Sequence, residues 1–157
     1  MQSVAPIQLI RHRSGAPGLR LGLGPGLRPV GALDQLQALL DRSSFWAQGR
    51  SHAGLRTMLR GSAAAVSVWQ GRQLVGFGRA SSDSLFRAVL WDVVVAEEHQ
   101  GCGLGRRLVA ALLEHPQLRR VERVYLMTSN SSGFYQQLGF ETVSSQHLML
   151  KQDQTSG

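Results

Sequence analysis

A strand, a glycine-rich turn and an amphipathic helix follow one another directly in the second half of the chain, and this unit constrains the fold most. Residues 93–95 are three valines, and a run of β-branched residues is typical of a buried strand. Glycines then stand at alternate positions over 101–105, where they let the backbone turn sharply and let a ligand approach its amide groups. Apolar residues recur at helical spacing over 104–113, and Pro116 lies just beyond. This order predicts a mixed α/β fold.

The turn has the properties of a phosphate site. Backbone amides in the first turn of a helix, together with the positive end of the helix dipole, bind anions such as a pyrophosphate. Arg106 and Arg107 add positive charge at the same place. A phosphate-binding Walker loop is excluded because it requires a lysine that the turn lacks, and the glycine spacing and late position do not fit a dinucleotide fingerprint. The remaining alternative is a plain glycine-rich turn.

The other apolar patterns complete an alternation of strands and helices. They predict strands at 7–13, 63–69, 74–80, 85–95, 121–127, 140–143 and 146–150, and helices at 33–40, 55–59, 104–113 and 132–138. Residues 14–29 are dense in glycine and proline, which predicts a flexible loop. No acidic residue precedes Asp34 and the same stretch holds four arginines, which leaves an organellar transit segment as a minor alternative to a first strand and a loop.

Length and composition set the class of protein. A chain of 157 residues with 43% hydrophobic residues predicts one domain, 1–157, with a single core. No apolar run approaches the roughly 20 residues that cross a bilayer, so we expect no membrane span. The single cysteine, Cys102, allows no internal disulfide and no thiolate metal site, and the histidines lack metal-ligand spacing. We therefore expect no metal and a reducing compartment, either the cytoplasm or an organellar stroma.

The formal charge of +7 has three possible explanations. They are nucleic-acid binding, attraction of a small anionic ligand, and a compositional bias, because all the basic residues except Lys151 are arginine. The arginines are scattered and form no run longer than a pair. Aromatic residues make up only 6% and form no stripe with basic residues, which argues against nucleic acid.

Two motifs resemble one known superfamily. The run Gln100-Gly101-Cys102-Gly103-Leu104-Gly105 resembles the Gln/Arg-x-x-Gly-x-Gly/Ala signature of the GNAT superfamily of acetyl-CoA-dependent N-acetyltransferases, and the later Phe134-Tyr135-Gln136-Gln137-Leu138-Gly139-Phe140 resembles its second motif. The resemblance implies a central, mostly antiparallel, twisted sheet of about six to seven strands. Helices would cover both faces of the sheet, which would splay between its fourth and fifth strands.

A closer resemblance is to the plastid and cyanobacterial branch of the superfamily. Arg79-Ala80-Ser81-Ser82-Asp83 and Trp91-Asp92-Val93-Val94-Val95 carry it. Members of that branch acetylate protein lysines and N-termini, and some act on serotonin or other arylalkylamines. As we align them, Thr128 stands where the branch often has aspartate, so this chain lacks that carboxylate. The resemblance to this branch implies an acceptor that is either a primary amine of a protein or a small arylalkylamine.

The superfamily resemblance also assigns residues to roles. Acetyl-CoA would contact Val93, Val94, Val95, Gln100, Gly101, Cys102, Gly103, Leu104, Gly105, Arg106, Asn130, Phe134 and Tyr135. Tyr135 would protonate the departing thiolate of CoA. Asp92 is a candidate for the base or an anchor of the amine, and Trp91 could line the acceptor site. Neighbours in a strand point to opposite faces, so we expect only one of Trp91 and Asp92 to face the acceptor.

Several alternatives stay open. Tyr135 could be a packed aromatic with a satisfied hydroxyl, and Asp92 a buried, hydrogen-bonded structural carboxylate. The chain could bind CoA as a sensor without turnover, or be a non-enzymatic nucleic-acid-binding module. Either a monomer or a homodimer is compatible with the sequence.

Overall fold

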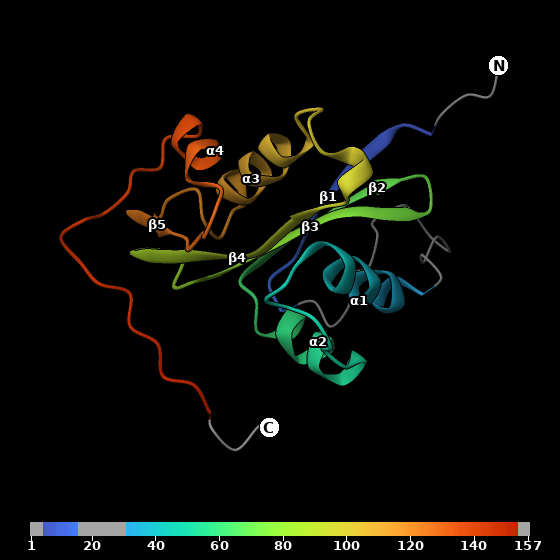
Figure 1. Ribbon diagram of the computed structural model, residues 1–157, viewed down its shortest axis with the longest axis horizontal. Helices are drawn as coiled ribbons and strands as arrows, with labels where there is room; N and C mark the ends of the chain where they lie inside the picture. The colour runs from blue at the N-terminus through green and yellow to red at the C-terminus, as the bar shows by residue number, and fades with distance from the viewer. Residues whose placement is uncertain (1–4, 16–30, 154–157) are drawn as a thin grey trace. The chain divides into compact units, whose positions relative to one another are not determined.

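The computed structural model of the protein describes residues 5–15 and 31–153 (Figure 1). It divides into two compact units, Met1–Met127 and Thr128–Gly157, and each unit is described by itself. The loop expected at 14–29 lies outside the described residues, apart from Ser14 and Gly15 at its start.

The first unit is built on a five-stranded sheet with the order β1-β2-β3-β4-β5. Among the first four strands every adjacent pair is antiparallel, and β5 pairs with β4 in parallel. Their bounds are Ile7–His12 for β1, Ala64–Gln70 for β2, Gln73–Ser82 for β3, Arg87–Val95 for β4 and Arg123–Tyr125 for β5. The N-terminal stretch therefore contributes a first strand, as predicted.

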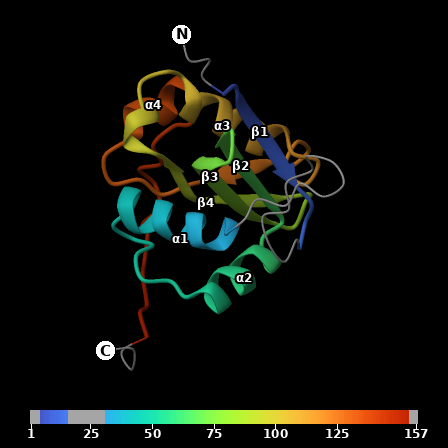
Figure 2. The same cartoon turned by 90° about the vertical axis from the view of Figure 1, so that its right-hand side faces the viewer.

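Helices cover both faces of this sheet (Figures 1 and 2). On one face α1, Ala32–Ser43, packs on β3 and β4 and is followed by α2, His52–Arg60. On the other face α3, Leu104–Glu114, packs on β2, β3 and β4 after the short 3-10 turn η1, Glu97–His99. This open, mixed sheet between two helical layers confirms the predicted fold class.

The core lies between the sheet and these helices, because each helix presents one apolar stripe to it. Most positions of the predicted helical periodicities are buried, whereas Leu33 and Met58 are only half-buried; the buried ones are Leu36, Leu39 and Leu40 of α1, Leu55 and Leu59 of α2, and Leu104, Leu108, Ala111 and Leu112 of α3. Every residue of β2 except Gln70 is buried, which fits a central strand covered on both faces. None of the described helices combines the length and apolar character that crossing a membrane requires.

The fourth and fifth strands pair only at one end. Residues Arg87, Ala88 and Val89 of β4 face Arg123, Val124 and Tyr125 of β5. From Leu90 to Val95, β4 has no strand on that side among the described residues. The sheet is therefore open beside the valine run, where the splay between the fourth and fifth strands is expected.

The second unit corrects the predicted number of strands. Helix α4, Ser132–Gln137, forms where a short helix is predicted. Residues 140–143 and 146–150, however, are not strands, so the described sheet has five strands rather than six to seven. A strand requires a neighbour for its backbone hydrogen bonds, and an apolar pattern reports only on side chains. Residues Leu148, Met149 and Leu150 are 76%, 89% and 79% exposed, so no layer covers them.

Candidate active site

A bulge interrupts β4 just before the valine run. Phe77 of β3 faces Val94, but Arg79 faces Trp91, so Gly78 alone stands opposite both Asp92 and Val93. Asp92 adopts φ 54°, a left-handed conformation that non-glycine residues rarely take and that occurs at the first position of one kind of bulge. The bulge has a glycine partner for a steric reason. A Cβ on Gly78 would lie 2.9 Å from the Leu112 side chain of α3.

The bulge changes which way the side chains point. Trp91 donates from Nε1 to Ser81 Oγ at 2.9 Å, and Arg79 donates from Nε to Asp92 Oδ2 at 2.8 Å. Arg79 and Ser81 are two residues apart in β3 and so lie on the same face. Trp91 and Asp92 therefore both lie on that face, and the expectation that they point to opposite faces is wrong. Strict alternation ends at a bulge, because the extra residue shifts the register.

Asp92 is buried and receives three hydrogen bonds. Trp46 Nε1 donates to Oδ1 at 3.0 Å, Arg50 Nη1 to Oδ2 at 2.9 Å and Arg79 Nε to Oδ2 at 2.8 Å. Only 3% of the Asp92 side chain is exposed. Burial by itself raises the pKa of this carboxyl, but the hydrogen bonds and charges of the two arginines outweigh burial and hold the pKa below its usual value. The carboxylate is therefore ionised at neutral pH.

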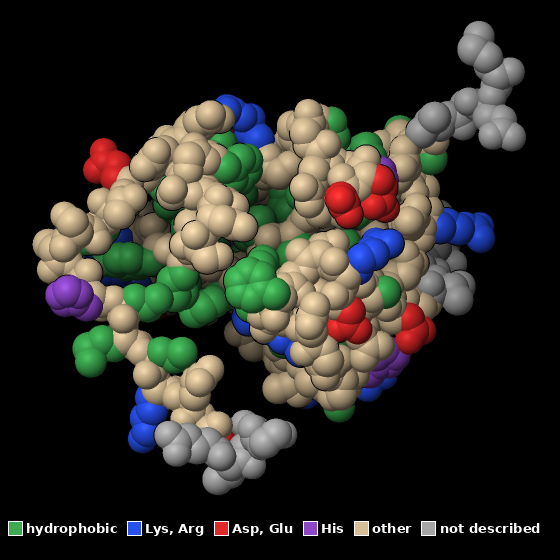
Figure 3. All heavy atoms as spheres, in the orientation of Figure 1, with side chains coloured by type: hydrophobic (Ala, Val, Ile, Leu, Met, Phe, Trp, Pro, Cys, Tyr) green, Lys and Arg blue, Asp and Glu red, His purple; other side chains and the backbone are tan. Residues whose placement is uncertain are grey.

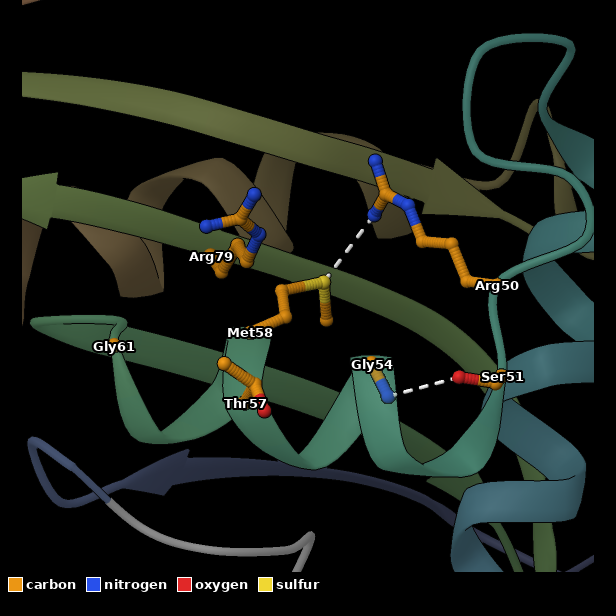
Figure 4. Close-up of a pocket in the computed structure, with 7 residues that line it drawn as sticks. All are labelled: Arg50, Ser51, Gly54, Thr57, Met58, Gly61 and Arg79. Carbon is orange, nitrogen blue, oxygen red and sulfur yellow. Dashed lines mark hydrogen bonds between the residues drawn. The ribbon is translucent and has the colours of Figure 1, made fainter. Parts of the chain in front are cut away.

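The two arginines line a pocket of about 510 Å³ beside the bulge (Figure 4). The other lining residues are Ser51, Gly54, Thr57, Met58 and Gly61. Gly54, Thr57, Met58 and Gly61 recur at helical spacing, so they form one face of α2 and its end, while the opposite stripe of α2 enters the core. Ser51 begins the helix by accepting a hydrogen bond from the Gly54 amide at 3.0 Å.

The glycine-rich turn after β4 leaves the start of α3 open. Gly101 and Gly103 have φ 82° and 83°, and Gly103 is the N-cap. The first amides of any helix have no acceptor within the helix, and here no capping side chain accepts from them either. The Gln100 side chain instead spans the turn and donates to the Val95 carbonyl at 3.0 Å.

The other residues predicted at this turn differ in whether their side chains are exposed or buried. Arg106, Arg107 and Cys102 are exposed, and the Cys102 thiol contacts the His99 carbonyl at 2.9 Å. The Leu104 side chain is buried in the core, so only its backbone can reach a ligand. Val94 is buried, whereas Val93 and Val95 are half-buried along the open edge of β4.

The second unit carries the remaining predicted residues. Tyr135 lies in α4, and its ring contacts Phe134 and Phe140 edge-on, with centroid distances of 5.0 and 5.8 Å. Burial raises the pKa of the Tyr135 hydroxyl above its ordinary value, so the hydroxyl keeps its proton at neutral pH. Asn130 is exposed and accepts a hydrogen bond from the Ser131 hydroxyl at 3.2 Å. The predicted site residues between Trp91 and Arg106 thus lie in the first unit, and Asn130, Phe134 and Tyr135 lie in the second.

Sequence reasoning missed Trp46, Arg50 and Arg79 as partners of Asp92. An aspartate in an apolar strand does signal that a cationic partner exists, because an unpaired buried charge is costly. With sixteen arginines in the chain, the sequence does not reveal which ones those are. Within 5–15 and 31–153, no three His, Cys, Asp or Glu side chains group as metal ligands would. Lys and Arg side chains occur at several separate places on the face seen in Figure 3.

Known proteins resemble this chain in both sequence and fold. A profile of the acetyltransferase (GNAT) family matches residues 33–140. GCN5-related N-acetyltransferase 1, chloroplastic, of Arabidopsis thaliana is 34% identical over 69% of this chain and 55% of its own length. Uncharacterized N-acetyltransferase ycf52 of Pyropia yezoensis is 33% identical over 69% of this chain and 64% of its own length. The matches thus span less than two thirds of these relatives.

Among solved structures, a protein of the GNAT family from Xanthomonas campestris pv. campestris matches with a TM-score of 0.69 and 25% identity, over 93% of this chain and 94% of its own. The family match covers most of the chain and includes both motifs. The plastid relative also agrees with the branch that the sequence resembles. This chain belongs to the acetyltransferase (GNAT) family.

Proposed function

We propose that this protein is an N-acetyltransferase that moves the acetyl group of acetyl-CoA to a primary amine while both substrates are bound. The observation that carries the proposal is the junction of β4 and α3. There an open strand edge, Leu90 to Val95, leads within a few residues to a helix start that no side chain caps and that Arg106 and Arg107 flank. This junction offers backbone hydrogen bonds to an extended arm, and amides and guanidinium groups to a pyrophosphate.

The residues at this junction fit a molecule with the parts of acetyl-CoA, which supplies a reactive thioester when bound. The backbone of Val93, Val94 and Val95 would hold the pantetheine arm and the acetyl carbonyl. Amides from Gly101 to Arg106 would bind the pyrophosphate, and Gln100 would keep the turn in shape through its bond to Val95. In the second unit, Asn130 and Phe134 would contact the pantetheine.

Tyr135 is the proposed general acid. Transfer to an amine releases a thiolate, which needs a proton. The Tyr135 hydroxyl is protonated at neutral pH, as that of any tyrosine with an ordinary or raised pKa is, so it has a proton to donate. Its packing against Phe134 and Phe140 would hold the ring in one position.

Asp92 is proposed to be a structural carboxylate that holds neighbouring side chains in place, rather than the base. The sequence leaves open a base, an amine anchor and a structural carboxylate, and the three hydrogen bonds support the last of these. A carboxylate that already accepts from Trp46, Arg50 and Arg79 has little capacity left to take a proton from an amine. Trp91 stays a candidate for the wall of the acceptor site on the same face.

The proposed acceptor class is broad: a protein lysine or N-terminus, or a small arylalkylamine. The proposed compartment is reducing, either the cytoplasm or a stroma, and the name of the Arabidopsis relative supports the second. The first test is titration calorimetry with acetyl-CoA, followed by assays with small amines, lysine peptides and N-terminal peptides. Absence of acetyl-CoA binding would overturn the proposal.

Substitution of Tyr135 tests the chemistry. Tyr135→Phe should lower kcat about a hundredfold or more, because general acid catalysis contributes roughly that much, and should leave the affinity for acetyl-CoA nearly intact. The matched control is Tyr125→Phe in β5, which removes the only other tyrosine hydroxyl. Steady-state rates and calorimetry measure the two effects. Equal rates for Tyr135→Phe and the wild type would exclude Tyr135 as the acid.

A further inference from the structure

The pocket between α2 and β3 has a charge that the proposed reaction does not use. Its lining includes two arginines and no acidic residue. Asp92 lies behind them with 3% of its side chain exposed, whereas 32% of the Arg50 side chain and 18% of that of Arg79 are exposed. Two cations and one anion leave a net charge of about +1, and the pocket surface presents the cations.

The arginines retain hydrogen-bond donors that Asp92 does not use. Arg50 uses Nη1 for both Asp92 and Met58 Sδ, and Arg79 uses Nε for Asp92 and Nη1 for Ser62. No described residue accepts a hydrogen bond from Nη2 of either arginine. In Figure 4 both guanidinium groups project over the same stretch of α2, with the Met58 side chain between them. Asp92 therefore fixes two guanidinium groups whose remaining donors are available to one anionic group.

The size and place of the pocket indicate a small ligand near the reacting groups. A volume of about 510 Å³ lies within the range of small-molecule sites. Arg79 is bonded to Asp92, and Asp92 directly precedes the valine run proposed to hold the acetyl group. Met58 and the arginine stems offer apolar contact to a short alkyl chain. A molecule with its acid on the arginines would thus lie against two side chains that contact Asp92, next to the valine run.

We propose that the acceptor is a small amine that also carries a carboxylate, and that Arg50 and Arg79 bind this carboxylate. A single carboxylate matches the net charge of the pocket, and the guanidinium fork matches its geometry. The inference rests on the proposed N-acetyltransferase activity and specifies a primary amine other than the protein amines and arylalkylamines that the family resemblance implies. Asp92 is then a positioning residue, because it acts on the acceptor through the arginines.

The test compares acids with neutral molecules of the same shape. A series of ω-amino acids, from glycine to 6-aminohexanoate, is assayed with acetyl-CoA against the matching ω-amino amides. For at least one chain length the acid should exceed its amide in kcat/KM by about ten- to a hundredfold, which is the usual worth of a hydrogen-bonded charge pair. The ratio is taken within each protein variant, so a general loss of activity cancels.

Variants assign the preference to the pocket. Arg50→Gln should reduce the acid-to-amide ratio to near one, and Arg50→Lys should restore part of it because the charge returns without the fork. The matched control is Arg56→Gln, which removes the same charge from an exposed position of α2 outside the pocket and should keep the wild-type ratio. Thermal unfolding confirms that each variant folds.

The outcomes separate this inference from the proposed function. Equal kcat/KM for acids and amides in the wild type, or a higher kcat/KM for lysine peptides or arylalkylamines than for every acid, would overturn the inference. Either result would leave the proposed N-acetyltransferase activity unaffected. Direct titration of the same acids covers the case of an inactive protein. Binding that Arg50→Gln abolishes would then support the pocket and contradict the acetyltransferase, and no binding would overturn both.

Discussion

Asp92 illustrates how one residue gains its properties from partners that are distant in sequence. Two of its donors, Trp46 and Arg50, come from the segment between α1 and α2, and the third, Arg79, comes from β3. They turn a buried carboxyl, whose pKa burial alone would raise, into one whose pKa lies below its usual value. If Asp92 were nevertheless the base, it would be ionised well below neutral pH. An acid limb of the rate near neutral pH would therefore belong to another group.

The low pKa of Asp92 also predicts how stability depends on pH. The folded pKa lies below the unfolded value of about 3.9, so the stabilisation by Asp92 is fully present above that value. It decreases as the pH falls through the folded pKa. Asp92→Asn should lower the free energy of unfolding by about 3–5 kcal/mol at neutral pH, because it leaves two arginines without their counter-charge. Below about pH 4 the difference from the wild type should shrink.

Urea unfolding over a series of pH values measures this effect. The matched control is Glu141→Gln, the same chemical change at an exposed position, which should stay within about 0.5 kcal/mol of the wild type. A difference for Asp92→Asn that does not change with pH would mean that lost packing, rather than lost charge, causes the destabilisation.

At the scale of elements, the turn between η1 and α3 depends on backbone conformation rather than on space. A Cβ on Gly103 would meet nothing within 4 Å, yet φ is +83° at that residue. Only conformational strain therefore opposes a side chain there, and asparagine tolerates this conformation better than alanine does. The same geometry leaves the first amides of α3 open to a phosphate.

Gly103→Ala should therefore lower the free energy of unfolding by about 1–2 kcal/mol, and Gly103→Asn should lower it by clearly less. Each kcal/mol corresponds to about 2–4 °C in Tm for a chain of this size, which calorimetry resolves. Equal losses in the two variants would contradict the strain argument, because asparagine has the larger side chain.

At the scale of the whole molecule, the charge of +7 has a specific and a general part. CoA is a polyanion, and Arg106 and Arg107 are exposed at its proposed phosphate site. On the face shown in Figure 3, Lys and Arg side chains lie at several separate places. Salt weakens exposed charge pairs, with a screening length of about 10 Å at 0.1 M.

The affinity for acetyl-CoA should thus fall roughly tenfold between low and high salt, as measured by calorimetry. Arg106→Gln with Arg107→Gln should flatten this dependence. Arg119→Gln with Arg120→Gln removes the same net charge from an exposed pair in the turn after α3 and should keep the dependence. If both double variants flatten it equally, net charge alone acts and the local phosphate site is wrong.

The sequence by itself determined the features that depend on neighbours in the chain. Most apolar positions at helical spacing in α1, α2 and α3 are buried, since a helix repeats every 3.6 residues whatever it packs on. The strands β1 to β4 also form close to their predicted positions. The glycine turn identified the proposed phosphate site and, with the second motif, the family, because these features lie in continuous stretches.

Tertiary structure decided what depends on partners from elsewhere. The runs at 140–143 and 146–150 have the apolar pattern of strands yet pair with no described strand, because a ladder needs a second backbone that the pattern does not report. The bulge at Asp92 places Trp91 and Asp92 on one face of the sheet. Of the sixteen arginines, the fold brings Arg50 and Arg79 to Asp92 and into the lining of the pocket. Charge pairing and strand register act through space, so only the folded chain fixes them.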